Sequence, residues 1–329
     1  MPLRELALPQ DLLRITAIAA ETWHYPENPE WSVQPDEEES LEDSVENYQR
    51  IWPLVRIAQF FSPGLRDFLH GHIWEDGDRV AGFTQFSRRG TTDTWLISAV
   101  GVHPDFRRRG IARQLVEAAI EFIRERGGKR ITLDVIEGNV PALGLYAKLG
   151  FERFTGNLET QITPGTAPAE PALPAGYSLV PVDDYAWKDR HALMLRITPA
   201  TVARYEPVEE GLYKRPAFMR LLFPLLKRAE GLQVHRRLIR DAEGQVVAYA
   251  MYDTRTRESG RNTIHAHLDP AHPALARFLL DHALHQIASA NPGRTVEFNI
   301  PLWQEALAAA AQEVGFETRV KLLTFGLLL

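Results

Sequence analysis

Trp95-Leu-Ile-Ser-Ala-Val-Gly-Val-His-Pro-Asp-Phe-Arg-Arg-Arg-Gly-Ile-Ala-Arg-Gln-Leu115 contains the clearest structural signals in the chain. Its first residues alternate at period two and are rich in β-branched and aromatic side chains, which predicts a strand. From Gly110 onward, apolar residues recur at helical spacing as far as Gly127-Gly128, so a helix is expected to end at this glycine pair. A strand that leads into a helix is typical of an α/β fold.

The segment between the predicted strand and helix, Pro104 to Gly110, is a short turn. The first N–H groups of a helix have no intrahelical acceptor, and the helix dipole is positive at that end. Gly110 has no Cβ to keep an anion away, and Arg107, Arg108 and Arg109 add bidentate donors. We therefore expect this turn to bind phosphate groups. The alternative, a solvated basic turn, explains the arginines but not the glycine at the helix start.

A glycine also interrupts the predicted strand, because Gly101 lies between Val100 and Val102. Such a glycine indicates a bulge or a close approach by another group. A bulge would splay the strand from its neighbour and leave amides and carbonyls free for an extended ligand that carries amides. The pantetheine arm of coenzyme A has that chemistry.

Two motifs in this half resemble the signatures of the GNAT acetyltransferases. Arg107-x-x-Gly110-x-Ala112 resembles R/Q-x-x-G-x-G/A, and Asn139-Val-Pro-Ala-Leu-Gly-Leu-Tyr146-Ala-Lys-Leu-Gly-Phe151 resembles N-x-x-A-x-x-x-Y-x-x-x-G-F. The first motif alone is weak. Both motifs occur in the family's order, each at a predicted strand-to-helix junction, and together they are specific. The resemblance covers residues 3 to 160 well and the remainder in outline.

The resemblance implies acetyl-CoA as cosubstrate and Tyr146 as the general acid that protonates the departing thiolate. From periodicity alone, Tyr146 would be a core aromatic and Asn139 an N-cap. The residues expected to contact the coenzyme are Val100, Gly101, Val102, Arg107, Arg108, Arg109, Gly110, Ile111, Ala112, Arg113 and Asn139. Backbone N–H groups near Val102 are expected to polarise the thioester carbonyl.

Composition excludes several other classes of function. A net charge of −6 argues against nucleic acid as the main partner. The absence of cysteine excludes disulfides, thiolate catalysis and cysteine metal sites, and the pairs His70/His72 and His282/His285 have no convergent partners, so no metal is expected. The apolar stretches near both ends are too short for a signal sequence or a membrane span, and a cytoplasmic protein without a membrane partner is expected.

The other elements of the first half are expected in a simple order. They are a strand at 3–7, a helix at 12–23 capped by Asp11, a hairpin at 70–76 and 79–88, a strand at 129–136 and further strand within 151–162. A proline-rich aromatic loop, 24–35, and an acidic segment, 36–46, follow the first helix. In the family this region borders the acceptor pocket, so substrate contacts are expected here. The acidic segment is either a solvated helix start or a wall that attracts a cationic substrate.

The second half repeats the first with altered chemistry. Residues 164–176 contain four prolines and are expected to link a catalytic domain, 1–163, to a degenerate, non-catalytic domain, 177–329. Alignment places Ala311 where Tyr146 lies and Gln304 where Asn139 lies, and it replaces the phosphate turn by Pro273-Ala-Leu-Ala276. The predicted fold is α/β (α+β): two tandem GNAT-like domains, each with a mixed, largely antiparallel twisted sheet flanked by helices.

The resulting hypothesis is an N-acetyltransferase that moves an acetyl group from acetyl-CoA to a primary amine by direct attack in a ternary complex. The acceptor is an unidentified small molecule or peptide, and the sequence does not specify the oligomeric state. Asp93, His103 and Glu159 are weak candidates for the general base, which stays unassigned. A non-catalytic sensor or scaffold that binds coenzyme A is the alternative. The tandem enzymes of the mycothiol synthase type are loosely similar, but their active unit is the C-terminal one.

Overall fold

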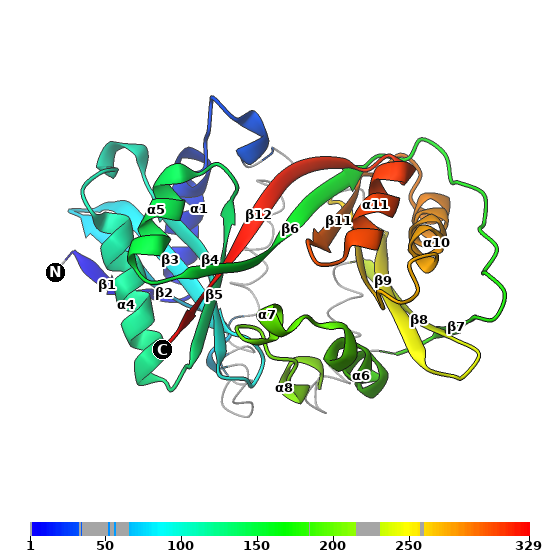
Figure 1. Cartoon of the computed structure of the whole chain (residues 1–329). Helices are drawn as coiled ribbons and strands as arrows, with labels where there is room; N and C mark the ends of the chain where they lie inside the picture. Colours follow the sequence, from blue (N-terminus) through cyan, green and yellow to red (C-terminus); the bar gives the residue numbers. More distant parts are fainter. Residues whose placement is uncertain are drawn as a thin grey trace. The chain divides into compact units, whose positions relative to one another are not determined.

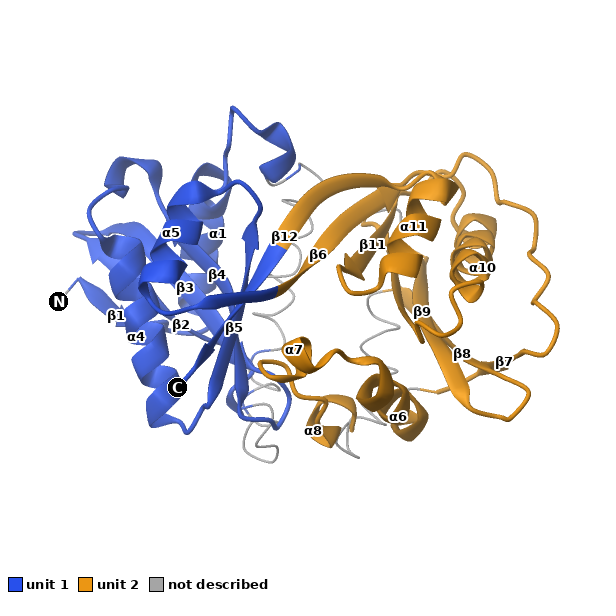
Figure 2. Cartoon of the chain, in the orientation of Figure 1, with its two compact units in different colours: residues 1–154, 323–329 blue, residues 155–322 orange. Residues whose placement is uncertain are grey.

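The computed structural model describes residues 2–32, 34, 52, 56, 66–183, 185–214, 231–256 and 260–329. The predicted acidic helix start at 36–46 lies outside these residues. The chain forms two compact units, which Figure 2 distinguishes by colour: unit 1 contains residues 1–154 and 323–329, and unit 2 contains residues 155–322. Within the described part of the chain, no helix is both long and apolar enough to cross a membrane.

Unit 1 is built on a mixed sheet in the strand order β1-β2-β3-β4-β5-β12 (Figure 1). The pairs from β1 to β4 are antiparallel, whereas β4 and β5 are parallel. The elements, in chain order, are β1 (Leu3–Glu5), α1 (Gln10–Thr22), η1 (Pro29–Trp31), β2 (His70–Asp76), β3 (Arg79–Arg88), β4 (Thr94–Val102), η2 (Pro104–Phe106), α4 (Ile111–Glu125), β5 (Arg130–Ile136) and α5 (Val140–Lys148). The predicted hairpin, strands and helices of this half are confirmed.

Helix α4 packs its apolar stripe against the sheet of unit 1. Leu115, Ala119 and Ile123 are fully buried, and Ile123 belongs to the core cluster around Trp95. The helix ends where the glycine pair predicts, since the N–H of Gly128 donates to the carbonyl of Ile123 at 2.9 Å in a C-terminal cap. The buried stripe therefore holds α4 against the sheet, and with it the end of the turn that precedes the helix.

The start of α1 differs from the sequence prediction. The helix begins at Gln10, and its N-cap residue, Pro9, has no side-chain capping bond. Asp11 is therefore not the cap. Its carboxylate accepts hydrogen bonds from the N–H of Ala7 at 2.7 Å and from the guanidinium of Arg4 at 2.6 Å and 2.9 Å, contacts that hold the pKa of Asp11 below its usual value. Arg4 on β1 therefore binds the carboxylate that the sequence assigned to the cap of this helix.

Unit 2 repeats the element order of unit 1. Its elements are β7 (Ser178–Pro181), α6 (Trp187–Ile197), α7 (Ala200–Ala203), α8 (Glu210–Tyr213), β8 (Leu232–Arg240), β9 (Val246–Arg255), β10 (Asn262–Leu268), α10 (Leu275–Ala290), β11 (Val296–Pro301) and α11 (Glu305–Val314), with the strand order β12-β6-β11-β10-β9-β8-β7. The parallel pair β10–β11 corresponds to β4–β5. The predicted internal repeat is therefore confirmed.

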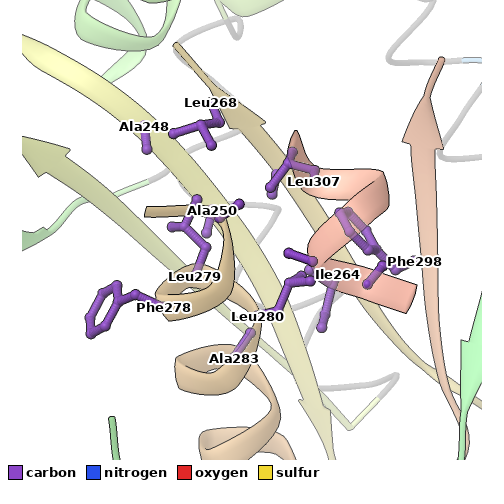
Figure 3. Packing of buried hydrophobic residues seen from close by; sticks show 14 of the residues in the cluster. Ala248, Ala250, Ile264, Leu268, Phe278, Leu279, Leu280, Ala283, Phe298 and Leu307 are labelled. Carbon is purple, nitrogen blue, oxygen red and sulfur yellow. The ribbon is translucent and has the colours of Figure 1, made fainter. Parts of the chain in front are cut away.

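The core of unit 2 lies between its sheet and helices α10 and α11, as the close view in Figure 3 shows. Side chains from three neighbouring strands meet those of both helices. Among them are Ala248 and Ala250 from β9, Ile264 and Leu268 from β10, Phe298 from β11, Leu279, Leu280 and Ala283 from α10, and Leu307 from α11. This complete apolar core is what the predicted packing role of the second half requires.

The limits of the compact units differ from the predicted domain limits at two strands. Strand β6 (Glu152–Ile162) begins in unit 1 and continues in unit 2, and β12 (Glu317–Leu328) runs from unit 2 into unit 1. Residues 155–163 thus belong to unit 2, and residues 323–329 belong to unit 1. A strand of eleven or twelve residues is long enough to contribute side chains to the cores of both units.

The proline-rich segment 164–176 has neither helix nor strand. It is nevertheless packed on unit 2. Leu173 contacts the unit 2 core, the carbonyl of Pro168 lies 2.8 Å from the Nδ1 atom of His285, and the carbonyl of Pro164 accepts the N–H of Gly293. The segment is therefore part of unit 2, although its composition resembles that of a linker.

Candidate active site

The predicted phosphate turn has the backbone of an anion site. Gly110 is the N-cap of α4 and has φ +78°, a left-handed conformation that glycine adopts without strain. The first helical hydrogen bond runs from the N–H of Gln114 to the carbonyl of Gly110. The N–H groups of Ile111, Ala112 and Arg113 therefore have no intrahelical acceptor. Among the described residues beyond its chain neighbours, a Cβ on Gly110 would meet only Nε2 of Gln114 within 4 Å, so the space in front of the turn is open.

The arginines of the turn have different surroundings. Arg107 donates from Nη2 to the carbonyl of Thr22 at 2.8 Å and from Nε to the carbonyl of Val102 at 3.2 Å, so it connects the end of α1 to the turn. Arg109 donates to the carbonyl of Asp105 at 3.1 Å, and Arg113 pairs with Glu117 one turn along the helix at 2.8 Å. Arg108 is exposed and makes no hydrogen bond or ion pair with the described residues. Arg107 thus has a bracing role that the sequence did not indicate.

The bulge predicted at Gly101 lies three residues earlier. The β3–β4 register shifts at Ser98, whereas Gly101 pairs regularly with Phe83. A Cβ on Gly101 would lie 2.6 Å from the ring of Phe83 and 2.7 Å from Cγ2 of Thr22. The glycine is therefore required by the close packing of α1 on the strand. The bulge lies at Ser98, where the register between β3 and β4 shifts.

The predicted splay of β4 from β5 is present. Their parallel pairing covers Thr94–Ile97 against Arg130–Leu133 and goes no further, although β4 continues to Val102. The N–H of His103 donates to the carbonyl of Ala81 at 3.0 Å, so the N–H groups of the alternate residues Val102 and Val100 point away from β3. These two residues therefore direct backbone groups into the space from which β5 has separated.

Tyr146 lies on α5 in the same core cluster as the residues of β4. Its side chain is 7% exposed, and its ring meets the edge of Phe151 at 5.7 Å. Burial raises the pKa of the phenol, and the nearby Tyr25 raises it further. The phenol therefore keeps its proton at neutral pH. Val100 packs against the same cluster, so the hydroxyl-bearing ring and the splayed end of β4 share one core.

Asn139 caps α5, as its N-cap interpretation predicted, with Oδ1 accepting the N–H of Ala142 at 3.3 Å. Its side chain also bonds to that of Tyr25, whose pKa is raised by burial. The ring of Tyr25 meets that of Trp31 at 5.7 Å, and Trp31 lies over Gly138. The aromatic loop after α1 thus lies on the turn that carries Asn139. Sequence reasoning pointed to this loop but did not single out Tyr25 or Trp31.

The three weak candidates for a general base all have partners. His103 is buried; its Nδ1 accepts the N–H of Asp105, and its Nε2 lies 2.8 Å from Glu21. Asp93 pairs with Arg130 and Lys129, and Glu159 pairs with Arg319 in unit 2. The described residues contain no group of three or more His, Asp or Glu side chains that could hold a metal ion.

The corresponding region of unit 2 has the same backbone and different side chains. The N–H of Phe316 donates to the carbonyl of Ala311, as Phe151 does to Tyr146, and Gln304 is the N-cap of α11. The alignment of Ala311 and Gln304 with Tyr146 and Asn139 is therefore confirmed. Oε1 of Gln304 accepts the N–H of Leu268 at 3.0 Å, and Leu268 corresponds to Val102.

The turn before α10 is shorter than the turn before α4. Its N-cap residue, Ala274, has the right-handed φ of −61°, and only four residues separate Pro270 from Leu275, against six between Pro104 and Ile111. No left-handed glycine opens the amides here. The turn before α10 thus differs from the turn before α4 in its length and in the conformation of its N-cap residue.

Comparison with known proteins identifies this fold and its motifs. The model of the acetyltransferase (GNAT) family matches residues 21–151. The ribosomal protein bS18 alanine N-acetyltransferase of Salmonella typhimurium is 36% identical over 113 residues, which are 34% of this chain and 72% of that enzyme. The chain belongs to the GNAT acetyltransferase family.

Two further proteins are similar to the chain, each over a different share of its length. Streptothricin acetyltransferase of Streptomyces lavendulae is 38% identical over 95 residues, 29% of this chain and 49% of that enzyme, so the chain spans about half the length of this relative. The solved structure of a tandem GNAT protein from the clavulanic acid biosynthesis pathway is 19% identical, has a TM-score of 0.63, and is covered over 98% of its length by 99% of this chain. This likeness confirms the predicted tandem fold.

Proposed function

We propose that unit 1 binds acetyl-CoA and transfers the acetyl group to a primary amine by direct attack in a ternary complex. The observation that carries the proposal is the turn at Gly110, whose open helix amides follow a strand that has separated from its parallel neighbour. A diphosphate fits the turn and an amide-bearing arm fits the strand. Membership of the GNAT family supports the same chemistry.

Each part of the coenzyme would meet a different part of unit 1. The N–H groups of Ile111, Ala112 and Arg113 would bind the pyrophosphate, with Arg108 and Arg109 adding charge. Backbone groups of Val100 would pair with the pantetheine arm, and Asn139 would lie beside the coenzyme. Arg107 would act indirectly by keeping α1 against the turn.

Transfer would require few side chains. The amine nitrogen attacks the thioester carbon, and the N–H of Val102 stabilises the negative charge that develops on the carbonyl oxygen. The carbon–sulfur bond then breaks, and Tyr146, which burial keeps protonated, gives its proton to the thiolate. The amine proton leaves to a base that remains unassigned.

A thiol-release assay with acetyl-CoA tests the proposal. The amine panel contains small aminated compounds and peptides with a free N-terminus, because the two relatives compared here are named for a small molecule and for a ribosomal protein. Release that depends on the amine supports transfer. Tight binding of coenzyme A in calorimetry without release under any amine would favour the sensor or scaffold function instead.

A further inference from the structure

One face of the unit 2 sheet gathers polar side chains that the proposed acetyl transfer does not use. Tyr249 on β9 and His267 on β10 are directly opposite each other in the antiparallel register. Such cross-strand partners project from the same face with Cβ atoms about 5 Å apart. His265 lies two residues from His267, so it projects from that face as well.

Arg190 reaches this face from helix α6. Its guanidinium carbon lies 4.7 Å from the centre of the Tyr249 ring and 5.2 Å from that of Tyr213. No carboxylate among the described residues pairs with Arg190, which is unusual for a half-buried guanidinium. The arginine lies close to two aromatic rings, and the described residues provide no anion for it.

Three buried polar atoms in this group have no hydrogen-bond partner among the described residues: Nε of Arg190, the hydroxyl of Tyr249 and Nδ1 of His267. Tyr249 is only 2% exposed, so its hydroxyl is not compensated by water at the surface. Buried polar atoms in folded proteins are nearly always paired. Three such atoms on one face leave a place for a further polar group beside the described residues of this cluster.

The charge of the cluster limits what that group can be. Burial, together with the charge of Arg190, lowers the pKa of His267 to about 3. Asp253, a carboxylate near His265, is held by the side chains of Asn262 and Thr263. His267 is therefore neutral at neutral pH, and Arg190 carries a single positive charge.

We propose that Arg190, Tyr249 and His267 form a binding site in unit 2 for a small molecule that carries a carboxylate on an apolar body. A planar carboxylate matches the guanidinium fork, and its single charge matches the single cation. The rings of Tyr213 and Trp303 provide the apolar walls, since Trp303 stacks on His267 with an angle of 5° between the ring planes. His265 is exposed, and Arg190 and His267 are partly exposed, so the face is open to solvent.

This site does not depend on the acetyl transfer proposed for unit 1. Its residues come from α6, α8, β9, β10 and the segment after β11, and none of them corresponds to the turn at Gly110. Loss of coenzyme binding through the Gly110 turn should leave it intact. The two proposals can therefore fail separately.

The test follows the imidazole signals of the full chain by NMR, with the signal of His267 assigned from a His267→Gln variant. Benzoate and hexanoate are titrated as probes, with benzamide as the uncharged match for benzoate and inorganic phosphate as the dianion. We expect both carboxylates to shift the His267 signal saturably and benzamide to leave it unchanged. Arg190→Gln should weaken benzoate binding at least about tenfold, and Arg190→Lys, which keeps the charge without the fork, should weaken it less.

Arg204→Gln is the matched control, because Arg204 is also stacked on a tyrosine of unit 2, 5.2 Å from the ring of Tyr205, and lies outside the cluster. Its benzoate affinity should equal that of the unaltered chain. Three results would overturn the proposal: no saturable shift with either carboxylate, equal benzoate affinity in a folded Arg190→Gln variant, or a response to phosphate alone.

Discussion

The turns before α4 and before α10 start from the same backbone geometry and end with different chemistry. In unit 1 the N–H of His103 donates to Ala81, and in unit 2 the N–H of Asp269 donates to Val247. In both units the preceding N–H group therefore points away from this partner strand. That of Val102 faces the space left by β5, whereas that of Leu268 is bonded to the side chain of Gln304.

The two units keep the same order of elements and differ in the groups that meet these backbone amides. Gln304 uses its side chain where an external ligand could bind, and the buried amide of Leu268 is satisfied within the chain. Ala274 starts α10 in the right-handed conformation, so the left-handed opening at Gly110 has no counterpart. The turn of unit 2 therefore differs from the candidate coenzyme site of unit 1 at few residues.

The largest effect is expected from deletion of residues 323–329, which unit 1 takes from the end of the chain. Leu323 and Phe325 are buried in the cluster of Tyr146, and Thr324 donates to Asp134 at 2.6 Å. Each buried apolar side chain contributes about 2 kcal/mol, and a domain has a margin of about 5–15 kcal/mol. Hydrogen exchange should show unit 1 losing its protection while the α10 core of unit 2 keeps it. Unchanged protection of β5 would contradict this expectation, and Thr324→Val is the control that removes only the hydrogen bond.

The second-largest effect is expected from a substitution in the turn before α4. Gly110→Glu places a carboxylate and a strained left-handed residue at the helix start, so affinity for coenzyme A should fall about a hundredfold or more. The matched variant Ala274→Glu, at the N-cap of α10, should leave it unchanged. Calorimetry measures both, with the melting temperature as a check on folding. A folded Gly110→Glu chain with unaltered affinity would remove the phosphate assignment.

Tyr146→Phe removes a single hydroxyl from the buried face of α5. If the phenol donates the proton, turnover should fall about a hundredfold while the affinity for coenzyme A stays nearly constant. Tyr177→Phe in unit 2, which removes a hydroxyl bonded to His272, is the control and should keep the full rate. Near-native turnover of Tyr146→Phe would return Tyr146 to the core-aromatic interpretation.

The smallest effect is expected from Gln304→Ala. The change leaves the buried N–H of Leu268 without an acceptor, which should destabilise unit 2 by about 1–3 kcal/mol. Because the turn before α10 still lacks its glycine, calorimetry should continue to find one coenzyme molecule per chain. A second molecule bound by this variant would show that Gln304 alone closes the site.

Features that depend on local backbone requirements could be predicted from the chain alone. Gly110 marks a helix start, Gly128 a helix end and Asn139 an N-cap, and each is found where it was expected, whereas the left-handed φ of Gly110 comes from the structure. The repeated order of elements could also be read from the chain, because it rests on periodicity and turn residues that lie close together. The candidate phosphate turn follows from such a local signal, whereas the end of the β4–β5 pairing does not follow from Gly101, which pairs regularly with Phe83.

Which groups are already engaged depends on the packing of elements that lie far apart in the chain. Arg107 braces Thr22 across 85 positions of the chain, Gln304 bonds to Leu268 across 36, and Thr324 reaches Asp134 across 190. A pattern of residues does not specify such pairs, because they depend on how distant elements pack. The same reason explains why Gly101 adapts the strand to α1 instead of forming the bulge, and why the sequence did not single out Arg190, which lies beside the rings of Tyr249 and Tyr213.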